Sequence, residues 1–288
     1  MRFEGPGAVG ASTHGGETIT IVGDHFGADP SAIEAVRYGD LGEPEFDVTS
    51  SCSLIEPHTK IQCTTAEGVG GASIEWVVTV NRQHSTAPRT SAAVPIITTV
   101  ELVNKTDGAL LPSANVAGGD VLRIHGDHFT TTSRRIDWVR YGVADNQVEA
   151  RGCVIREAHT LIECETASAG GRDLPVLLSI SGQQSAVTAA SPAISYTPPR
   201  VVSTTPRHID TAGGGRLTIV GSSLGPLGYA SVLLDGEQLE VARVGQDMRE
   251  LVVLTPPGTG ASHELVVVQS AVPGSTVNEQ RSTAFSLS

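Results

Sequence analysis

The sequence predicts an all-β protein built from three β-sandwich domains in tandem. One motif, a Gly pair followed by alternating apolar residues, a further Gly and a large apolar residue, occurs three times, beginning at Gly15, Gly118 and Gly213. The period is about 100 residues, which matches whole small domains rather than the short units of a solenoid. Short alternating runs between Gly/Pro turns fill the remainder, and no long run of helical period appears.

Each copy of the motif predicts a turn, a strand and a second turn. The Gly pair permits backbone angles that a side chain would forbid. The alternating apolar residues share one face of the strand, and in order of repeat they are Ile19 and Ile21, Leu122 and Ile124, and Leu217 and Ile219. The large residue three places after the closing Gly is expected to close one end of the core, and it is Phe26, Phe129 or Leu224.

The first repeat is expected to cover residues 1–93. After the opening strand, the alternation predicts strands at 33–39, 45–48, 59–63 and 73–80. The other two repeats have an apolar segment before the Gly pair, at 96–100 and 201–203, whereas residues 1–13 have little β-strand character. We therefore expect the first repeat to lack its first strand and the chain to be a segment of a longer protein.

The second and third repeats are expected to cover residues 94–197 and 198–288. The second copies the first closely, since the run Val-Arg-Tyr-Gly occurs at both 36–39 and 139–142. The third has drifted: it has no cysteine, and its strands are expected at 232–236, 251–256 and 265–269. Few residues separate the repeats, and the joints contain proline, so a stiff rod is expected.

Four cysteines form two pairs with the same spacing, Cys52 with Cys63 and Cys153 with Cys164. In each pair the second cysteine lies on the inward face of a strand and the first lies across a short gap, within the reach of a disulfide. A loop this short would gain about 3 kcal/mol in the chain-entropy model. The third repeat loses both members, with Val253 and Ala242 aligned at those positions. We predict two disulfides and therefore an oxidising compartment.

Further features bear on location and partners. Asn104-Lys105-Thr106 is a candidate N-glycosylation site in a polar loop. The net charge is −12, and no basic stripe is visible, which argues against nucleic acid as a partner. No apolar run approaches the length of a membrane span, so this segment is not expected to insert into a membrane. We expect an extracellular or cell-surface location.

The combination of the Gly framework, the closing aromatic, the Ile-x-Cys-x-Thr strand and a late Val-rich strand resembles the IPT/TIG family. These are immunoglobulin-like domains of plexins, scatter-factor receptors, fibrocystin-like proteins and some transcription factors. The third repeat keeps the family's Thr-Pro at Thr255-Pro256, where the other repeats have Thr65-Ala66 and Thr166-Ala167. The resemblance implies three tandem immunoglobulin-like sandwiches, but it does not imply one function.

The residues that could carry chemistry are few. No nucleophile elbow is present, so we predict no catalytic residue and no enzyme. An Asp-His pair recurs at 24–25 and 127–128, and His58 recurs as His159. These side chains could ligate a metal, but they lie on different turns, and the third repeat has Ser222-Ser223 and Met248 there. We interpret them as turn residues and predict no metal site and no cofactor; no acidic cluster indicates calcium at the joints.

The functional hypothesis is a non-enzymatic structural or adhesion segment. The modules would act as spacers, protein-interaction units or filament-building units, with sheet edges and loops offered to protein partners or to other copies. Trp138 is the one aromatic residue expected to be exposed, and it could stack on a ligand such as a sugar. The alternatives are a carbohydrate-binding accessory to an enzyme and an intracellular transcription-associated IPT protein.

Overall fold

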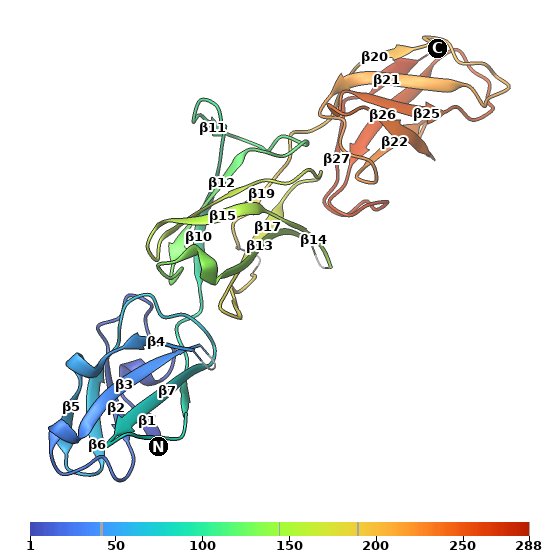
Figure 1. Ribbon diagram of the computed structural model, residues 1–288. Coiled ribbons are helices and arrows are strands. Elements are labelled where there is room, and N and C mark those ends of the chain that lie inside the picture. The colour runs from blue at the N-terminus through green and yellow to red at the C-terminus, as the bar shows by residue number, and fades with distance from the viewer. Residues whose placement is uncertain (41–42, 144, 189, 288) are drawn as a thin grey trace.

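The computed structural model describes residues 1–40, 43–143, 145–188 and 190–287, and its three β-sandwiches lie end to end (Figure 1). Each sandwich consists of two antiparallel sheets. The predicted fold class, all-β with tandem sandwiches, is confirmed, and no α-helix occurs among the described residues. Short 3-10 turns at Pro6–Ala8, Pro30–Ala32, Thr49–Ser51 and Ser133–Arg135 are the helical elements there.

The first sandwich has its strands between Arg2 and Thr90. Its first sheet has the order β1 (Arg2–Glu4), β2 (Thr18–Val22), β6 (Lys60–Thr64) and β5 (Ser53–Glu56). Its second sheet has the order β4 (Glu43–Asp47), β3 (Ile33–Asp40), β7 (Ile74–Val80) and β8 (Gln83–His84), and β9 (Arg89–Thr90) also pairs with β7.

The second sandwich repeats this topology and adds one short strand. The first sheet has the order β11 (Leu110–Leu111), β10 (Ile96–Val103), β12 (Val121–Asp127), β16 (Leu161–Glu165) and β15 (Arg151–Glu157). The second has the order β14 (Asn146–Glu149), β13 (Ile136–Val143), β17 (Leu174–Ile180) and β18 (Gln183–Gln184), and β19 (Ala193–Ile194) also pairs with β17.

The third sandwich has the same topology despite its drifted sequence. The first sheet has the order β20 (Arg200–Thr205), β21 (Arg216–Ser222), β25 (Glu250–Leu254) and β24 (Val241–Val244). The second has the order β23 (Glu237–Leu239), β22 (Ala230–Leu234), β26 (His263–Gln269) and β27 (Gln280–Arg281), and β28 (Phe285–Leu287) also pairs with β26.

The first sandwich was expected to lack its first strand, but the structure has one, β1. Strand β1 pairs with β2, with Phe3 opposite Ile21, at the place where β10 pairs with β12. The strand has only three residues, too few for a visible alternation. The Phe3 ring packs 5.5 Å from the Trp76 ring, so this short strand is held by the core that it helps to cover.

The core of each sandwich is formed by the residues that the alternation selects. The paired apolar residues of β2, β12 and β21 are fully buried, and so are the closing residues Phe26, Phe129 and Leu224. The glycine before each closing residue is required: a Cβ at Gly126 would lie 2.3 Å from the Phe129 ring and 1.9 Å from the Ile96 carbonyl oxygen. Each sandwich therefore has one apolar core closed by its own large residue.

Both predicted cysteine pairs are disulfides in the structure, Cys52–Cys63 and Cys153–Cys164, with Cα atoms 4.0 and 4.1 Å apart. The first joins β6 to Cys52, the residue directly before edge strand β5, and the second joins β16 to Cys153 in edge strand β15. In the third sandwich Val253 holds the second cysteine position, but Val241, not Ala242, lies opposite it. A register shift between Val241 and Arg243 moves the pairing by one residue, which a sequence alignment does not show.

Candidate functional site

Many polar side chains form hydrogen bonds or ion pairs across the joints between the sandwiches. At each joint the Gly-Gly turn before the late strand of one domain lies against the end of the late strand of the next. Gly70 and Gly71 meet Ile180 and Ser181 at the first joint. Gly170 and Gly171 meet Gln269 and Ala271 at the second. The same backbone contact is therefore built twice.

A tyrosine holds the turn that forms each joint. The Ala66 amide donates to the Tyr38 hydroxyl oxygen at 2.6 Å, and the Ala167 amide donates to that of Tyr141 at 2.8 Å. Burial raises the pKa of Tyr38 to about 12, while the Ala66 hydrogen bond acts in the opposite direction. Both phenols therefore stay neutral and satisfy a backbone N–H that would otherwise be unpaired.

In the third sandwich the equivalent turn needs no tyrosine. Leu234 replaces the tyrosine, and Pro256 replaces the alanine. Because proline has no N–H, this turn has no donor for a phenol to satisfy. The Thr-Ala turns therefore occur with a tyrosine that accepts from the alanine N–H, and the Thr-Pro turn occurs with a leucine.

Ionic contacts hold the first joint. Arg135 follows Arg134 in the 3-10 turn before β13, and only 5% of it is exposed. Its guanidinium donates to Asp40 Oδ2 at 3.1 Å and to a Glu45 carboxylate oxygen, both in the first sandwich. It also lies 5.5 Å from the centroid of the Phe46 ring. A buried cation of the second domain is thus paired by acids of the first.

Neutral hydrogen bonds complete this joint. The Thr130 hydroxyl donates to the Gly68 carbonyl at 2.7 Å. Gln183 donates to the Ala92 carbonyl at 3.0 Å and accepts from the Gly71 amide at 3.2 Å. These contacts fix the first Gly-rich turn against the second sandwich.

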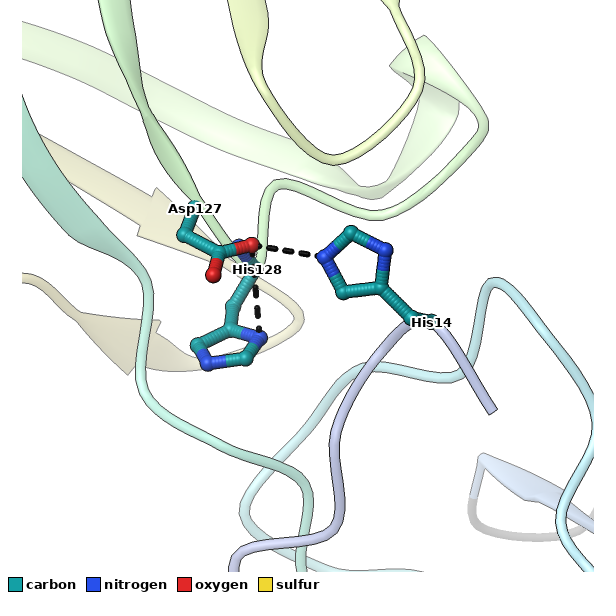
Figure 2. A group of neighbouring side chains, drawn as sticks. All are labelled: His14, Asp127 and His128. Atoms are coloured by element: carbon teal, nitrogen blue, oxygen red, sulfur yellow. Dashed lines mark hydrogen bonds and ion pairs between the residues drawn. The ribbon is translucent and has the colours of Figure 1, made fainter. Parts of the chain in front are cut away.

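A group of histidines lies beside these contacts (Figure 2). His14, from the turn before β2, places Nε2 2.8 Å from Asp127 Oδ1 at the end of β12. His128 Nδ1 lies 3.7 Å from the same oxygen. Burial raises the pKa of Asp127, but hydrogen bonds from His14 and the His128 amide outweigh it, so its pKa lies below the usual value.

His159 packs beneath this group. Its ring lies 4.1 Å from the His14 ring, and both its nitrogens have partners: Nδ1 is 2.9 Å from Thr13 Oγ1, and Nε2 is 3.1 Å from Glu67 Oε1. His159 therefore fixes the position of His14.

The recurring histidines occupy left-handed turns. The φ angles lie between 63° and 67° for His25, His58, His128 and His159. Their equivalents in the third sandwich, Ser223 and Met248, have φ of 51° and 56°. The turn, rather than a shared ligand, explains why these positions recur.

Hydrogen bonds to backbone carbonyls hold the second joint. Gln269, at the end of β26, is fully buried and donates to the Thr197 carbonyl of the second sandwich at 3.4 Å. The Arg172 guanidinium donates to the Glu279 carbonyl at 2.9 Å. Gln280 donates to the Tyr196 carbonyl at 2.9 Å. Asn278 donates to the carbonyls of Arg172 and Asp173, both at 2.9 Å. Ala271 belongs to the core of the second sandwich, so the third domain contributes to its neighbour's core.

The other predicted site residues lie away from the joints. Asn104 lies in the loop between β10 and β11, where its Oδ1 accepts from the Thr106 amide at 2.8 Å. Trp138 on β13 is only partly exposed, and the Arg140 guanidinium lies 4.6 Å from its ring centroid. Its ring is therefore not a free stacking platform.

Asp127, His128 and His159 are recognisable from the sequence as recurring turn residues, but Arg135 and His14 are not. Arg135 stands where the first repeat has Ala32, and His14 stands where the later repeats have Ala117 and Ala212. The sequence feature that could have indicated these two residues is an ionisable side chain that occurs in one repeat only, directly before a turn that all three repeats share.

Among the described residues, the helical elements include none with the length and apolar character of a membrane span.

Solved structures resemble the chain only distantly. The plexin A4 extracellular region has 12% identity and a TM-score of 0.28, covering 98% of this chain and 33% of that one. SGBP-B from a complex xyloglucan utilization locus in Bacteroides uniformis has 15% identity and a TM-score of 0.26, covering 65% of this chain and 48% of that one. The mouse nectin-like molecule 4 ectodomain has 12% identity and a TM-score of 0.27, covering 97% and 96%.

This chain thus spans about a third of the plexin chain and about half of SGBP-B. At these TM-scores the likenesses carry no weight for fold or function. A comparison with curated proteins found no match. The family comparison is specific: residues 199–283 match the model of the IPT/TIG domain. Most of the third sandwich, residues 199–283, is therefore identified as an IPT/TIG domain.

Proposed function

We propose that this chain is an extracellular structural segment, in which three IPT/TIG-like sandwiches form a stiff spacer that presents protein-binding surfaces. The first two sandwiches share the strand order of the third, which supports assigning them to the same domain type. IPT/TIG sandwiches are interaction and structural modules, and the proposal gives this one no enzymatic role.

The observation that carries the proposal is the repeated joint. At both joints a Gly-Gly turn lies directly on the next domain, and buried polar side chains complete the contact: Arg135 at the first and Gln269 at the second. Buried polar groups with specific partners favour one arrangement over its alternatives. Two such joints would keep the distance between the outer domains nearly constant.

The two disulfides support an extracellular location. Disulfides persist in oxidising compartments and are rare in the cytosol. A glycan on Asn104 would fit the same location and would project from the loop between β10 and β11.

Protein partners are proposed for the loops rather than for the edges next to the disulfides. The edge strands β5, β15 and β24 each have a register shift in their pairing, and β15 also carries Arg151, Arg156 and Glu157. Bulges and charges on an edge disfavour pairing with another chain. Filament formation through these three edges is accordingly not part of the proposal.

Small-angle X-ray scattering on the intact chain tests the spacer function. A stiff spacer gives a distance distribution that a single arrangement of the three sandwiches fits. The control is a variant with a long Gly-Ser insertion between Ala93 and Val94, which separates the first two sandwiches and should need a broad ensemble. If the natural chain needs an equally broad ensemble, the spacer proposal fails.

A further inference from the structure

We propose that the first joint holds a zinc ion between His14, Asp127 and His128, and that this ion ties the first two sandwiches together. His14 comes from the first domain, and Asp127 and His128 come from the second (Figure 2). The proposed function does not require this site.

The three ligand atoms are already gathered. His14 Nε2, Asp127 Oδ1 and His128 Nδ1 all lie within 4.8 Å of one another. The separations from the Asp127 oxygen are 2.8 Å to His14 and 3.7 Å to His128. Tetrahedral zinc with bonds of about 2.0–2.1 Å places neighbouring ligand atoms about 3.3 Å apart. Small side-chain rotations would therefore bring all three onto one ion.

An unsatisfied nitrogen points to a missing partner. His128 Nδ1 is buried and has no hydrogen-bond partner among the residues described in the structure. Buried polar atoms nearly always have a partner, and one without it needs an explanation. A cation between His128 and Asp127 would provide the missing contact.

The surroundings hold the ligands in place. The His159 ring lies 4.1 Å from His14, and both His159 nitrogens are engaged elsewhere, so His159 supports His14 without competing for the ion. The His128 amide donates to Asp127 Oδ1 at 2.7 Å and orients that carboxylate. Fixed ligand orientation raises metal affinity.

The donor set indicates the metal. Two imidazole nitrogens and one carboxylate oxygen are a common set for Zn²⁺, and three protein ligands leave a fourth position for water. Calcium and magnesium prefer oxygen ligands and fit this set poorly. Zinc would take the place of the hydrogen bond between His14 Nε2 and Asp127 Oδ1, and the proton of that bond would be released to solvent.

The second joint and the first domain provide comparisons within the chain. Ala117 and Ser222-Ser223 stand at the equivalent positions of the second joint, so no ligand set forms there. The first domain has the same pair, Asp24-His25, but among the described residues no third ligand completes a cluster with it. One ion per chain is therefore expected.

Isothermal titration of the intact chain with ZnCl₂ tests the site. One zinc ion should bind per chain, without dimer formation by light scattering, and X-ray absorption should show nitrogen and oxygen ligands. His14→Ala and His128→Asn should each weaken zinc affinity at least about 100-fold, more than the roughly 10–100-fold effect of losing an outer-shell partner. Asparagine tolerates the left-handed turn, so His128→Asn should fold.

The matched control is His25→Asn, which makes the same change in the same turn of the first domain. It should leave zinc affinity unchanged. Zinc should also raise the melting temperature of the natural chain and of His25→Asn, but not of His14→Ala. The proposal is overturned if the natural chain binds no zinc, if His14→Ala or His128→Asn binds as tightly as the natural chain, or if His25→Asn loses binding equally.

Discussion

The first and second joints connect equivalent surfaces through the same backbone contact, but with different side-chain chemistry. The first joint contains a buried arginine, four carboxylates and three histidines. The second contains amide side chains and one guanidinium, that of Arg172, which all donate to backbone carbonyls. Both joints bury polar groups, so both depend on specific partners, but only the first depends strongly on charge.

This difference shows how a tandem array can vary its joints without changing its fold. The Gly-Gly turn sets how closely two sandwiches approach, and it is the same in both joints. The residues around it then determine what holds the contact and which conditions loosen it. An ionic joint responds to salt, pH and cations, whereas an amide joint should respond weakly to all three.

The largest expected effect comes from removing the acids that pair Arg135. The double variant Asp40→Asn/Glu45→Gln keeps the side-chain volumes but removes both carboxylates that pair with the buried Arg135 guanidinium. Because an uncompensated buried charge is strongly unfavourable, the free energy of unfolding should fall by about 3–4 kcal/mol. Urea denaturation at low salt measures this change.

The control for that variant is Glu149→Gln. It removes the partner of Arg140, an exposed pair within the second sandwich at 2.9 Å. Exposed ion pairs contribute less than about 1 kcal/mol. If the double variant is no less stable than this control, Arg135 does not hold the joint.

Much of the fold could be predicted from the sequence, whereas the joints could not. The disulfide spacing, the buried alternation and the closing residue Phe129 are local patterns that a single repeat displays. The contact of Arg135 with Asp40 joins residues 95 positions apart in different domains. No periodicity within a repeat records such a contact. Strand β1 was missed for another reason, since three residues are too few to show alternation.

Alkaline pH should destabilise the first sandwich but not the third. Unfolded tyrosine ionises near pH 10, whereas buried Tyr38 has a pKa of about 12. The folded state therefore keeps a proton that the unfolded state loses, so stability is complete below pH 10 and falls as pH rises from 10 to 12. The loss should reach about 3 kcal/mol.

Fluorescence of Trp76, whose ring lies 4.0 Å from that of Tyr38, reports unfolding of the first sandwich. The third sandwich has Leu234 at this position and should lack the effect. Unfolding rates are measured soon after a pH jump, because a short time at alkaline pH limits disulfide exchange. If the first sandwich is equally stable at pH 9 and pH 12, the raised pKa of Tyr38 does not contribute to its stability.

Glycine substitution at equivalent turns should distinguish the two joints. A Cβ at Gly171 would lie 2.6 Å from the Ala271 amide nitrogen, whereas a Cβ at Gly71 would lie no closer than 3.4 Å to the Ser181 carbonyl oxygen. Both glycines have positive φ, 96° and 126°, so both alanine variants share backbone strain. The clash should make Gly171→Ala less stable than Gly71→Ala by about 2 kcal/mol.

Calorimetry of both glycine variants measures this difference. Gly171→Ala should also loosen the third sandwich from the second, which broadens the scattering ensemble, while Gly71→Ala should leave it narrow. Equal stability and equal scattering would mean that the second joint can relax around an added methyl group, and that the close approach is not what holds it.

The smallest expected effect concerns the turn behind the joint. Tyr38→Phe removes the acceptor of the Ala66 N–H and should lower the free energy of unfolding by about 1–2 kcal/mol, because a buried donor is left unpaired. Adding Ala66→Pro removes that donor and gives an apolar residue facing a proline, as Leu234 and Pro256 do in the third sandwich. The double variant should therefore be more stable than Tyr38→Phe alone, whereas Ala66→Pro in the natural background should not be stabilising. A double-mutant cycle by urea denaturation gives the coupling, and strictly additive effects would show that the tyrosine and the alanine do not act as a pair.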